Sequence, residues 1–206
     1  MKHLFYITLL FFVLKIQGQN MTEKSFSSEG ISALVVDGDL MFKIRVKTAK
    51  TNTILVRSLV EGEHNEQVVL ITEIKNNQLQ ISSKYQPLFI ADNDKLSAHK
   101  AISIELEMVV PENLDVQVSS SMASVFVSGT YHQFVSELKS GSFQAEGFQG
   151  NLLVNTIHGH IKVASNKAKL TVSSKYGEVK EARIETGNNL IKLNSINGNI
   201  TVTKTE

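Results

Sequence analysis

Hydrophobic and polar positions alternate along most of this chain, and in its second half the alternation is organised into a repeat. Five turns recur there, the first four 18 residues apart and the last after a step of 21. Their central residues are Ala123, Gly141, Gly159, Gly177 and Gly198. An apolar residue follows each turn by two positions, in the set Val125, Phe143, Ile161, Val179 and Ile200. Another precedes each turn by seven positions, in the set Val116, Phe134, Leu152, Leu170 and Ile191. Such constant columns predict a β scaffold made of repeated units.

Each repeat supplies one strand that runs toward the turn and a second strand that leaves it. A unit of about 18 residues cannot enclose a core by itself, so neighbouring units bury their apolar faces by stacking. The sequence therefore predicts a solenoid-like stack of about five 18-residue rungs, in which Phe143, Ile161 and Val179 follow one another in an interior ladder. A chain of hairpins is the alternative, because Asn197-Gly198 also suits a type I′ turn. The constant columns favour the stack.

The turn glycines are expected where the backbone takes a positive φ, which glycine adopts without a Cβ clash. Ala123 suits such a corner least, so the first corner is expected to be wider. The column five positions before each turn is also apolar, except at Ser136.

The first half reads as strands joined by short turns. One strand would have Leu40, Phe42, Ile44 and Val46 on one face, and Met41, Lys43, Arg45 and Lys47 on the other. Further strands are expected at 31–36, 53–60, 67–74, 78–83 and 102–110. Their connections are rich in Gly, Asn and Asp, so sequential strands are expected to pair antiparallel.

These patterns predict an all-β protein with an antiparallel N-terminal region at 20–110 and a repeat region at 111–206. The two regions are expected to share one continuous core. Residues 84–100 interrupt the pattern, and a loop of this length in a compact domain is more often functional than a tight connection is.

Residues 1–19 have the features of a secretory signal. Lys2 and His3 form a basic start, Leu4 to Leu14 is an apolar run too short to span a membrane, and Ile16 to Gln19 is a polar exit. Cleavage between Gly18 and Asn20 is expected. The mature chain would then be exported, soluble in the periplasm or outside the cell, and not stably inserted in the membrane.

Charge and composition exclude several classes of function. The chain carries 21 basic and 20 acidic residues with no basic block, which argues against nucleic acid as a partner. It has no cysteine, so disulfides, thiolate metal sites, cysteine nucleophiles and a lipid anchor on an N-terminal cysteine are all excluded. It also has no tryptophan, the usual platform on which sugars stack.

No candidate catalytic or metal site meets the requirements of its chemistry. His158 and His160 flank Gly159 and could be joined by Glu178, but zinc needs three or four ligands in fixed geometry, and equivalent positions in other repeats hold varied polar residues. The run Asp92-Asn93-Asp94 suggests calcium, yet it lacks the Gly and distal Glu of an EF-hand loop. Serines cluster at 119–121 and 140–142 without a G-x-S-x-G elbow or a triad.

A glycan-active enzyme on a β-solenoid is the strongest catalytic alternative, since stacked strands can present acids along a groove. Glycoside hydrolysis needs paired carboxylates at close range. The acids of the repeats do not recur one rung apart; they are Glu137, Glu146, Glu178, Glu181 and Glu185. We therefore expect no catalytic, cofactor-binding or metal-binding residue and no cofactor.

Several segments together resemble a known family. They are Val110 to Val116, Ser119 to Ser121, Val125 to Gly129, Ser140-Gly141-Ser142 and three further x-Gly-x-[Ile/Val] motifs, preceded by Ile31 to Val36, Phe42 to Ile44 and Leu79 to Ile81. Over residues 25–203 the chain is similar to the GIN-domain family, named putative auto-transporter adhesin heads, and to related adhesin repeats of Bacteroidetes. The resemblance implies a right-handed solenoid-like stack, export to the envelope and no catalytic residues.

The sequence thus predicts a non-catalytic, exported, adhesin-like binding or structural module of the cell envelope. Its partner would be a macromolecule or a glycan, held by exposed strand faces or by the loop at 84–100. The alternative is a glycan-active hydrolase or lyase. The identity of the partner and the oligomeric state stay open.

Overall fold

The computed structural model describes residues 20–62, 65–86 and 102–205. In this part the only helical element is the 3-10 turn η1 (Asn65–Gln67), so the prediction of an all-β fold is confirmed. The strands are β1 (Asn20–Ser27), β2 (Ala33–Asp37), β3 (Lys43–Ala49), β4 (Thr53–Glu61), β5 (Val68–Lys75), β6 (Gln78–Tyr85), β7 (Ser103–Pro111), β8 (Asp115–Ser120), β9 (Ser124–Leu138), β10 (Phe143–Thr156), β11 (Ile161–Ala164), β12 (Lys167–Ser174), β13 (Val179–Glu181), β14 (Glu185–Ser195) and β15 (Ile200–Thr203). The predicted strands lie where the alternation placed them, and β1 was missed.

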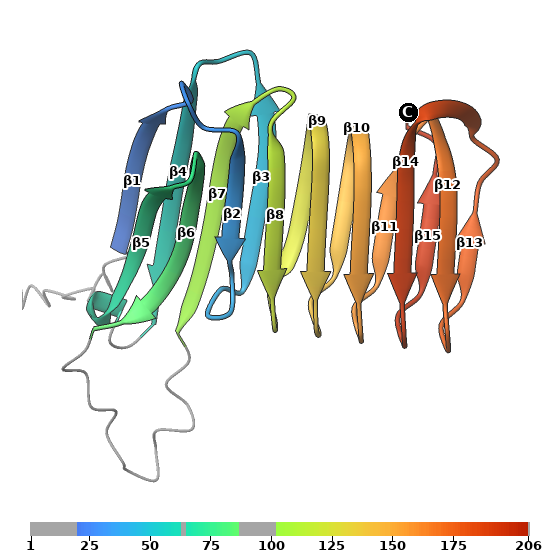
Figure 1. Cartoon of the computed structure of the whole chain (residues 1–206). Coiled ribbons are helices and arrows are strands. Elements are labelled where there is room, and N and C mark those ends of the chain that lie inside the picture. Colours follow the sequence, from blue (N-terminus) through green and yellow to red (C-terminus); the bar gives the residue numbers. More distant parts are fainter. Residues whose placement is uncertain (1–19, 63–64, 87–101, 206) are drawn as a thin grey trace, which may run out of the picture.

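The strands form one hydrogen-bonded sheet that folds back into two layers (Figure 1). The first layer has the order β1-β4-β7-β3-β9-β10-β11-β15-β13. The second layer runs β5-β6-β2-β8-β9-β10-β14-β12. The long strands β9 and β10 belong to both layers. They cross between them near Gly129, Gly147 and Gly150, which all have positive φ.

Pairing in the N-terminal region differs from the prediction. Antiparallel neighbours are β1 with β4, β4 with β7 and β5 with β6. The strands β2 and β3 instead pair parallel with their neighbours on both sides, including β8 and β9 of the repeat region. Within residues 20–110 three of the five pairings are thus antiparallel, as expected, but the expectation that sequential strands pair is wrong except for β5 with β6. A short turn does not require the two strands that it joins to pair with each other. Here a short turn joins β2 and β3, which lie in different layers.

Parallel pairing joins the repeats at the register that the columns predict. Phe143 pairs with Val125 on one side and with Ile161 on the other. Ile161 then pairs with Ile200, and Ile200 pairs with Val179. The predicted succession of Phe143, Ile161 and Val179 is wrong at its last step, because β15 lies between β11 and β13. The second layer shows the same order, with β14 between β10 and β12.

The interior is a single cluster of buried apolar side chains contributed by both layers. Ile44 and Val46 of β3 are buried as the alternation predicts, but Phe42 is exposed and Met41 is fully buried in its place. The alternation fails here because β3 begins only at Lys43, after a bend. Aromatic side chains fill the region where β9 crosses between layers. The Tyr131 ring stacks on Phe148 with centroids 5.5 Å apart and meets the edge of Phe134 at 5.3 Å.

The repeat turns stack along one long edge of the molecule, which we call the turn edge and which lies at the bottom of Figure 1. It consists of residues 38–42, 121–123, 139–142, 157–160, 196–199 and 175–178. A Cβ added at Gly159 would overlap the carbonyl oxygen of Gly141, and one at Gly198 would overlap that of Gly159. These turn glycines do not have positive φ. Contact between successive turns, and not the predicted backbone conformation, is the reason for glycine.

Hydroxyl groups support these turns from three positions upstream. The N–H groups of Gly159, Gly198 and Gly177 donate to Thr156 Oγ1, Ser195 Oγ and Ser174 Oγ at 2.9, 2.8 and 3.0 Å. Ala123 N–H donates to Ser120 Oγ at 2.9 Å in the same way. Serine and threonine in these columns therefore have a structural role.

Candidate functional site

A row of side chains crosses the outer surface of the first layer, one from each strand. Strand register places Arg57, Glu107, Arg45, Phe126 and Gln144 side by side on β4, β7, β3, β9 and β10. The position of Arg45 follows from the alternation of β3, which sends Ile44 and Val46 inward. The alternation in the sequence places Arg45 and Lys47 on the outer face, as observed, but no sequence signal indicates a function for them.

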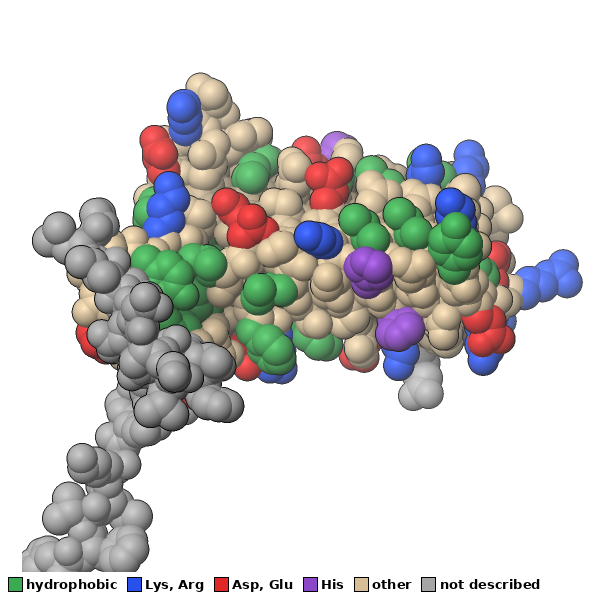
Figure 2. Space-filling view, turned by 90° about the horizontal axis from the view of Figure 1, so that it is seen from below, with side chains coloured by type: hydrophobic (Ala, Val, Ile, Leu, Met, Phe, Trp, Pro, Cys, Tyr) green, Lys and Arg blue, Asp and Glu red, His purple; other side chains and the backbone are tan. Residues whose placement is uncertain are grey.

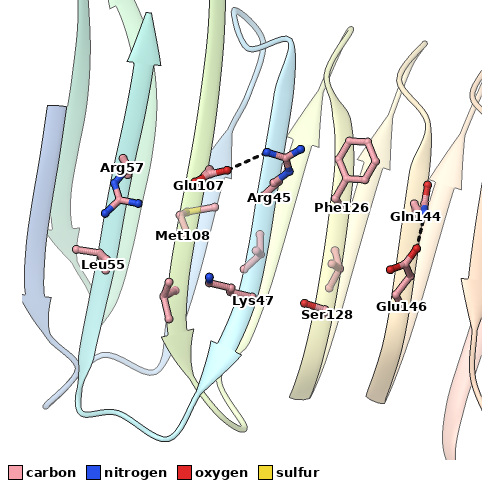
Figure 3. A pocket seen from close by; sticks show the side chains of 13 residues that line it. Arg45, Lys47, Leu55, Arg57, Glu107, Met108, Phe126, Ser128, Gln144 and Glu146 are labelled. Carbon is pink, nitrogen blue, oxygen red and sulfur yellow. Dashed lines mark hydrogen bonds and ion pairs between the residues drawn. The ribbon is translucent and has the colours of Figure 1, made fainter. Parts of the chain in front are cut away.

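A groove of about 310 Å³ lies over this row (Figure 3). Its lining also includes Lys47, Leu55, Ser128 and Glu146. The guanidinium of Arg45 lies 5.8 Å from the centre of the Phe126 ring, close enough for a cation–π contact. The groove thus combines one aromatic ring with cationic and polar groups.

Ion pairs neutralise part of the row. Arg45 contacts Glu107 at 2.9 Å and Arg57 contacts Glu23 at 2.7 Å. All four side chains are about half exposed, so each pair contributes little to stability and can exchange its partner for a ligand. Within residues 20–62, 65–86 and 102–205, Lys47 has no ion-pair partner. It is therefore the cation in the groove most ready to meet an anionic group.

The acids of the groove are far apart for paired-carboxylate chemistry. Glu107 is on β7 and Glu146 is on β10, with β3 and β9 between them. Three strand spacings separate them by about 14 Å, beyond the range of about 5 to 10 Å that glycosidases use. Gln144 Nε2 donates to Glu146 Oε1 at 2.7 Å. The arrangement suits binding better than acid–base catalysis.

A second, shallower hollow of about 600 Å³ lies on the outer surface of the second layer, beside the turn edge. Its polar centre contains Glu137, Asn155 and Asn194 on neighbouring strands. Asn194 Nδ2 donates to Asn155 Oδ1 at 2.8 Å. The two asparagines thus bond to each other, and the lining of the hollow has no aromatic group, so it is a weaker candidate.

The two histidines considered as metal ligands face asparagines of the next unit. His158 Nδ1 lies 2.9 Å from Asn197 Nδ2, and His160 Nδ1 accepts the backbone N–H of Asn199 at 3.0 Å. Glu178 is not in the adjacent unit as predicted, because the unit of Asn199 intervenes: Asn199 Oδ1 accepts the N–H of Glu178. Among the described residues no three His, Asp or Glu side chains are placed to hold a metal ion.

Two other sequence candidates lie outside the described residues. They are the run Asp92-Asn93-Asp94, with most of the loop 84–100, and the cleavage site between Gly18 and Asn20. In the described part of the chain, no helix has the length and apolar character needed to cross a membrane. The serines at 119–121 and 140–142 bond to neighbouring turns and strands, as in the contact of Ser142 Oγ with Ser124 Oγ at 3.1 Å.

No family model matches the chain, and no curated protein matches its sequence. Its fold resembles that of a putative cell adhesion protein from Clostridium sporogenes, with a TM-score of 0.61 and 11% identity over 91% of this chain and 100% of the other. A putative adhesin from Bacteroides fragilis matches with a TM-score of 0.38 and 10% identity over 90% and 98% of the two chains. A putative lipid binding protein from Parabacteroides distasonis gives 0.33 and 10% over 86% and 97%. The first likeness shows a shared fold and nothing about function.

Proposed function

We propose that this protein is a non-catalytic, adhesin-like binding module of the cell envelope that holds a glycan or another macromolecule in the groove of the first layer. The observation that carries this proposal is the Phe126 ring beside Arg45, with Lys47, which forms no ion pair with any described residue, two positions along the same strand. The shared fold with a protein named for cell adhesion supports it.

The groove fits an extended partner that crosses the strands. An aromatic face offers apolar contact to a sugar ring or a peptide side chain. Arg45 and Lys47 can then bond carboxylate or hydroxyl oxygens of the same partner. Because the groove spans five neighbouring strands, about 19 Å, it can contact several successive groups of a polymer.

We also propose the fold type, the family and the cellular location of the protein. The parallel ladders at 18-residue spacing support a right-handed β-solenoid for residues 111–206, with 20–110 as the N-terminal region on the same core. The segments from Val110 to Gly129 and the x-Gly-x-[Ile/Val] motifs of the repeats support membership of the GIN-domain family. The basic start and apolar run of residues 1–19 support export to the periplasm or the cell exterior.

A glycan-active hydrolase or lyase is the competing function. The acids of the groove would be its candidate catalytic groups, yet Glu107 pairs with Arg45 and lies three strands from Glu146. The groove therefore favours binding over turnover.

The test is a glycan and envelope-protein array with the purified protein, followed by affinity measurements on each hit. Phe126→Ala and Lys47→Ala should each weaken binding about tenfold, as expected for central contact residues. Lys192→Ala, an exposed lysine on the second layer, is the matched control and should bind normally. Turnover of any hit, abolished by Glu107→Gln or Glu146→Gln, would replace this proposal with the enzymatic alternative.

A further inference from the structure

Several large apolar side chains are exposed along the turn edge. Five of them lie at the tips of its turns and are between 38% and 69% exposed: Phe42, Met122, Ile157, Ile196 and Tyr176. We call this set the apolar ridge. Away from this edge, the large hydrophobics exposed among the described residues include Val69, Ile71 and Ile74 on β5, and Leu190 on β14. A row of exposed apolar side chains along one edge marks an interaction site.

Hydrogen bonds between successive turns fix the C-terminal half of the ridge, whereas the turn at 139–142 contributes no apolar side chain. Asn197 N–H donates to Ile157 O and Tyr176 N–H donates to Ile196 O, both at 2.8 Å. Ile157, Ile196 and Tyr176 therefore come from consecutive turns. From the turn of Phe42 to that of Tyr176 there are five strand spacings, about 24 Å. The apolar ridge consists of turn tips and is convex, so it cannot enclose a small ligand.

Basic side chains flank the centre of the ridge. Backbone bonds between turns place Lys139 beside Ile157 on one side and Lys175 beside Ile196 on the other. The Lys175 Nζ also lies 4.9 Å from the centre of the Tyr176 ring. The acids nearby are Asp39, whose Oδ1 accepts the N–H of Ser121, Glu178, which pairs with Lys180, and Glu137 in the hollow beside the edge. Figure 2, which views this edge from below, shows hydrophobic side chains along it with lysine and histidine among them.

The described chain also begins at this edge. Register across the first layer places Met21 level with Leu59, Glu105, Lys43 and finally Ser124, next to the turn of Met122. Met21 is 61% exposed and therefore adds an apolar side chain at the same end of the strands as the ridge.

We propose that the apolar ridge docks this protein on the surface of a bilayer that contains anionic lipids. Phe42, Met122 and Tyr176 would enter the boundary between headgroups and acyl chains, at the depth of about 5 to 10 Å typical of interfacial segments. Tyrosine is favoured at that depth because its ring is apolar and its hydroxyl stays hydrated. Lys139 and Lys175 would bind lipid phosphates. A flat bilayer suits a row of protruding turn tips, whereas a protein partner would need a long complementary groove.

The test measures flotation of the purified protein with vesicles of phosphatidylcholine and phosphatidylglycerol. The ridge variant combines Phe42→Ser, Met122→Ser and Tyr176→Ser, and the control combines Ile74→Ser and Leu190→Ser at comparable exposure. The ridge variant should lose at least about tenfold in vesicle partitioning, while the control keeps it. Since residues 1–19 are identical in both, the difference reports the ridge alone. Circular dichroism verifies that both variants are folded.

A second readout reports orientation. Because the chain has no cysteine, Met122→Cys and Leu190→Cys each give a single site for an environment-sensitive dye. The dye at position 122 should shift to the blue on vesicles, and the dye at 190 should not. Equal partitioning of both variants, absence of vesicle binding, or a shift only at 190 would overturn the proposal. Loss of binding to an envelope protein by the ridge variant, without vesicle binding by the parent, would assign the ridge to a protein partner instead.

Discussion

The middle of the stack and its C-terminal end are built from the same repeat but are buried differently. In the middle, Ile161 has a strand on each side and is fully buried, whereas Val179 at the equivalent position of β13 is 41% exposed. Among the described strands, the end unit of β12 and β13 pairs only with β14 and β15. A residue's column therefore shows which way it points, and its place in the stack decides how much stability it contributes.

A charge inside the interior columns tests this difference most severely. Ile161→Asp should lower the free energy of unfolding by about 4 kcal/mol or more, because an unpaired carboxylate would be buried between two strands. Val179→Asp, the matched change at the end, should cost within about 1 kcal/mol. Urea unfolding of both variants measures this. Equal losses would mean that β13 is not at the end of the stack.

The turn glycines offer a second comparison of middle and end. Gly159→Ala should cost about 3 kcal/mol, because its Cβ overlaps the carbonyl of Gly141 within a stack that is held from both sides. Gly177→Ala meets the carbonyl of Gly198, but the end unit can shift outward, so we expect a smaller loss. Thermal unfolding compares them. A larger effect at 177 than at 159 would contradict this account of the glycines.

One buried hydroxyl in the middle of the stack lacks a hydrogen-bond partner among the described residues, and removing it should stabilise the protein. Ser136 is fully buried between Val118 and Val154, and its hydroxyl has no hydrogen-bond partner within the described chain. Ser136→Ala should raise the free energy of unfolding by about 1 kcal/mol. The control Ser120→Ala removes a hydroxyl that is bonded to Gly38 O and to the Ala123 N–H, so it should lower stability by a similar amount. The same sign for both in urea unfolding would refute the assignment.

Substitutions of exposed residues beside the turn glycines should have equally small effects on stability in the middle and at the end of the stack. His160→Ala removes an acceptor for the Asn199 N–H at an exposed site, and Glu178→Ala removes an exposed pair with Lys180. Each should change stability by less than about 0.5 kcal/mol. A large loss in urea unfolding for His160→Ala alone would show that the shoulder contributes to packing in the middle of the stack.

The sequence was sufficient to predict strands, inward columns and repeat register, because each depends on local alternation or on a fixed period. It did not predict the order of the units, because β13 and β15 have the same pattern of apolar positions and a constant period does not tell which of them lies next to β11. The sequence does contain one indication that β13 lies at the end of the stack. Glu181 occupies a column that is otherwise Val127, Ala145, Val163 and Val202, and an ionised side chain can stand there only in the last unit.

The groove and the apolar ridge were harder to anticipate. Arg45 and Phe126 are 81 positions apart in the chain, and the parallel pairing of β3 with β9 that makes them neighbours was not predicted. Phe42 was expected inside because it continues the alternation of Ile44 and Val46. The bend before β3 turns it outward, and bends of this kind leave no periodic trace in the sequence.

The central claim is that the last unit of the chain, β14 and β15, is inserted between its predecessors. Cysteine pairs test it directly, because the chain has no cysteine of its own. Lys162 and Thr201 are direct neighbours on β11 and β15, so Lys162→Cys with Thr201→Cys should oxidise to a disulfide. Lys162→Cys with Lys180→Cys spans two strand spacings, about 10 Å, and should stay reduced. A disulfide in the second pair but not in the first would place β13 next to β11 and contradict the strand order.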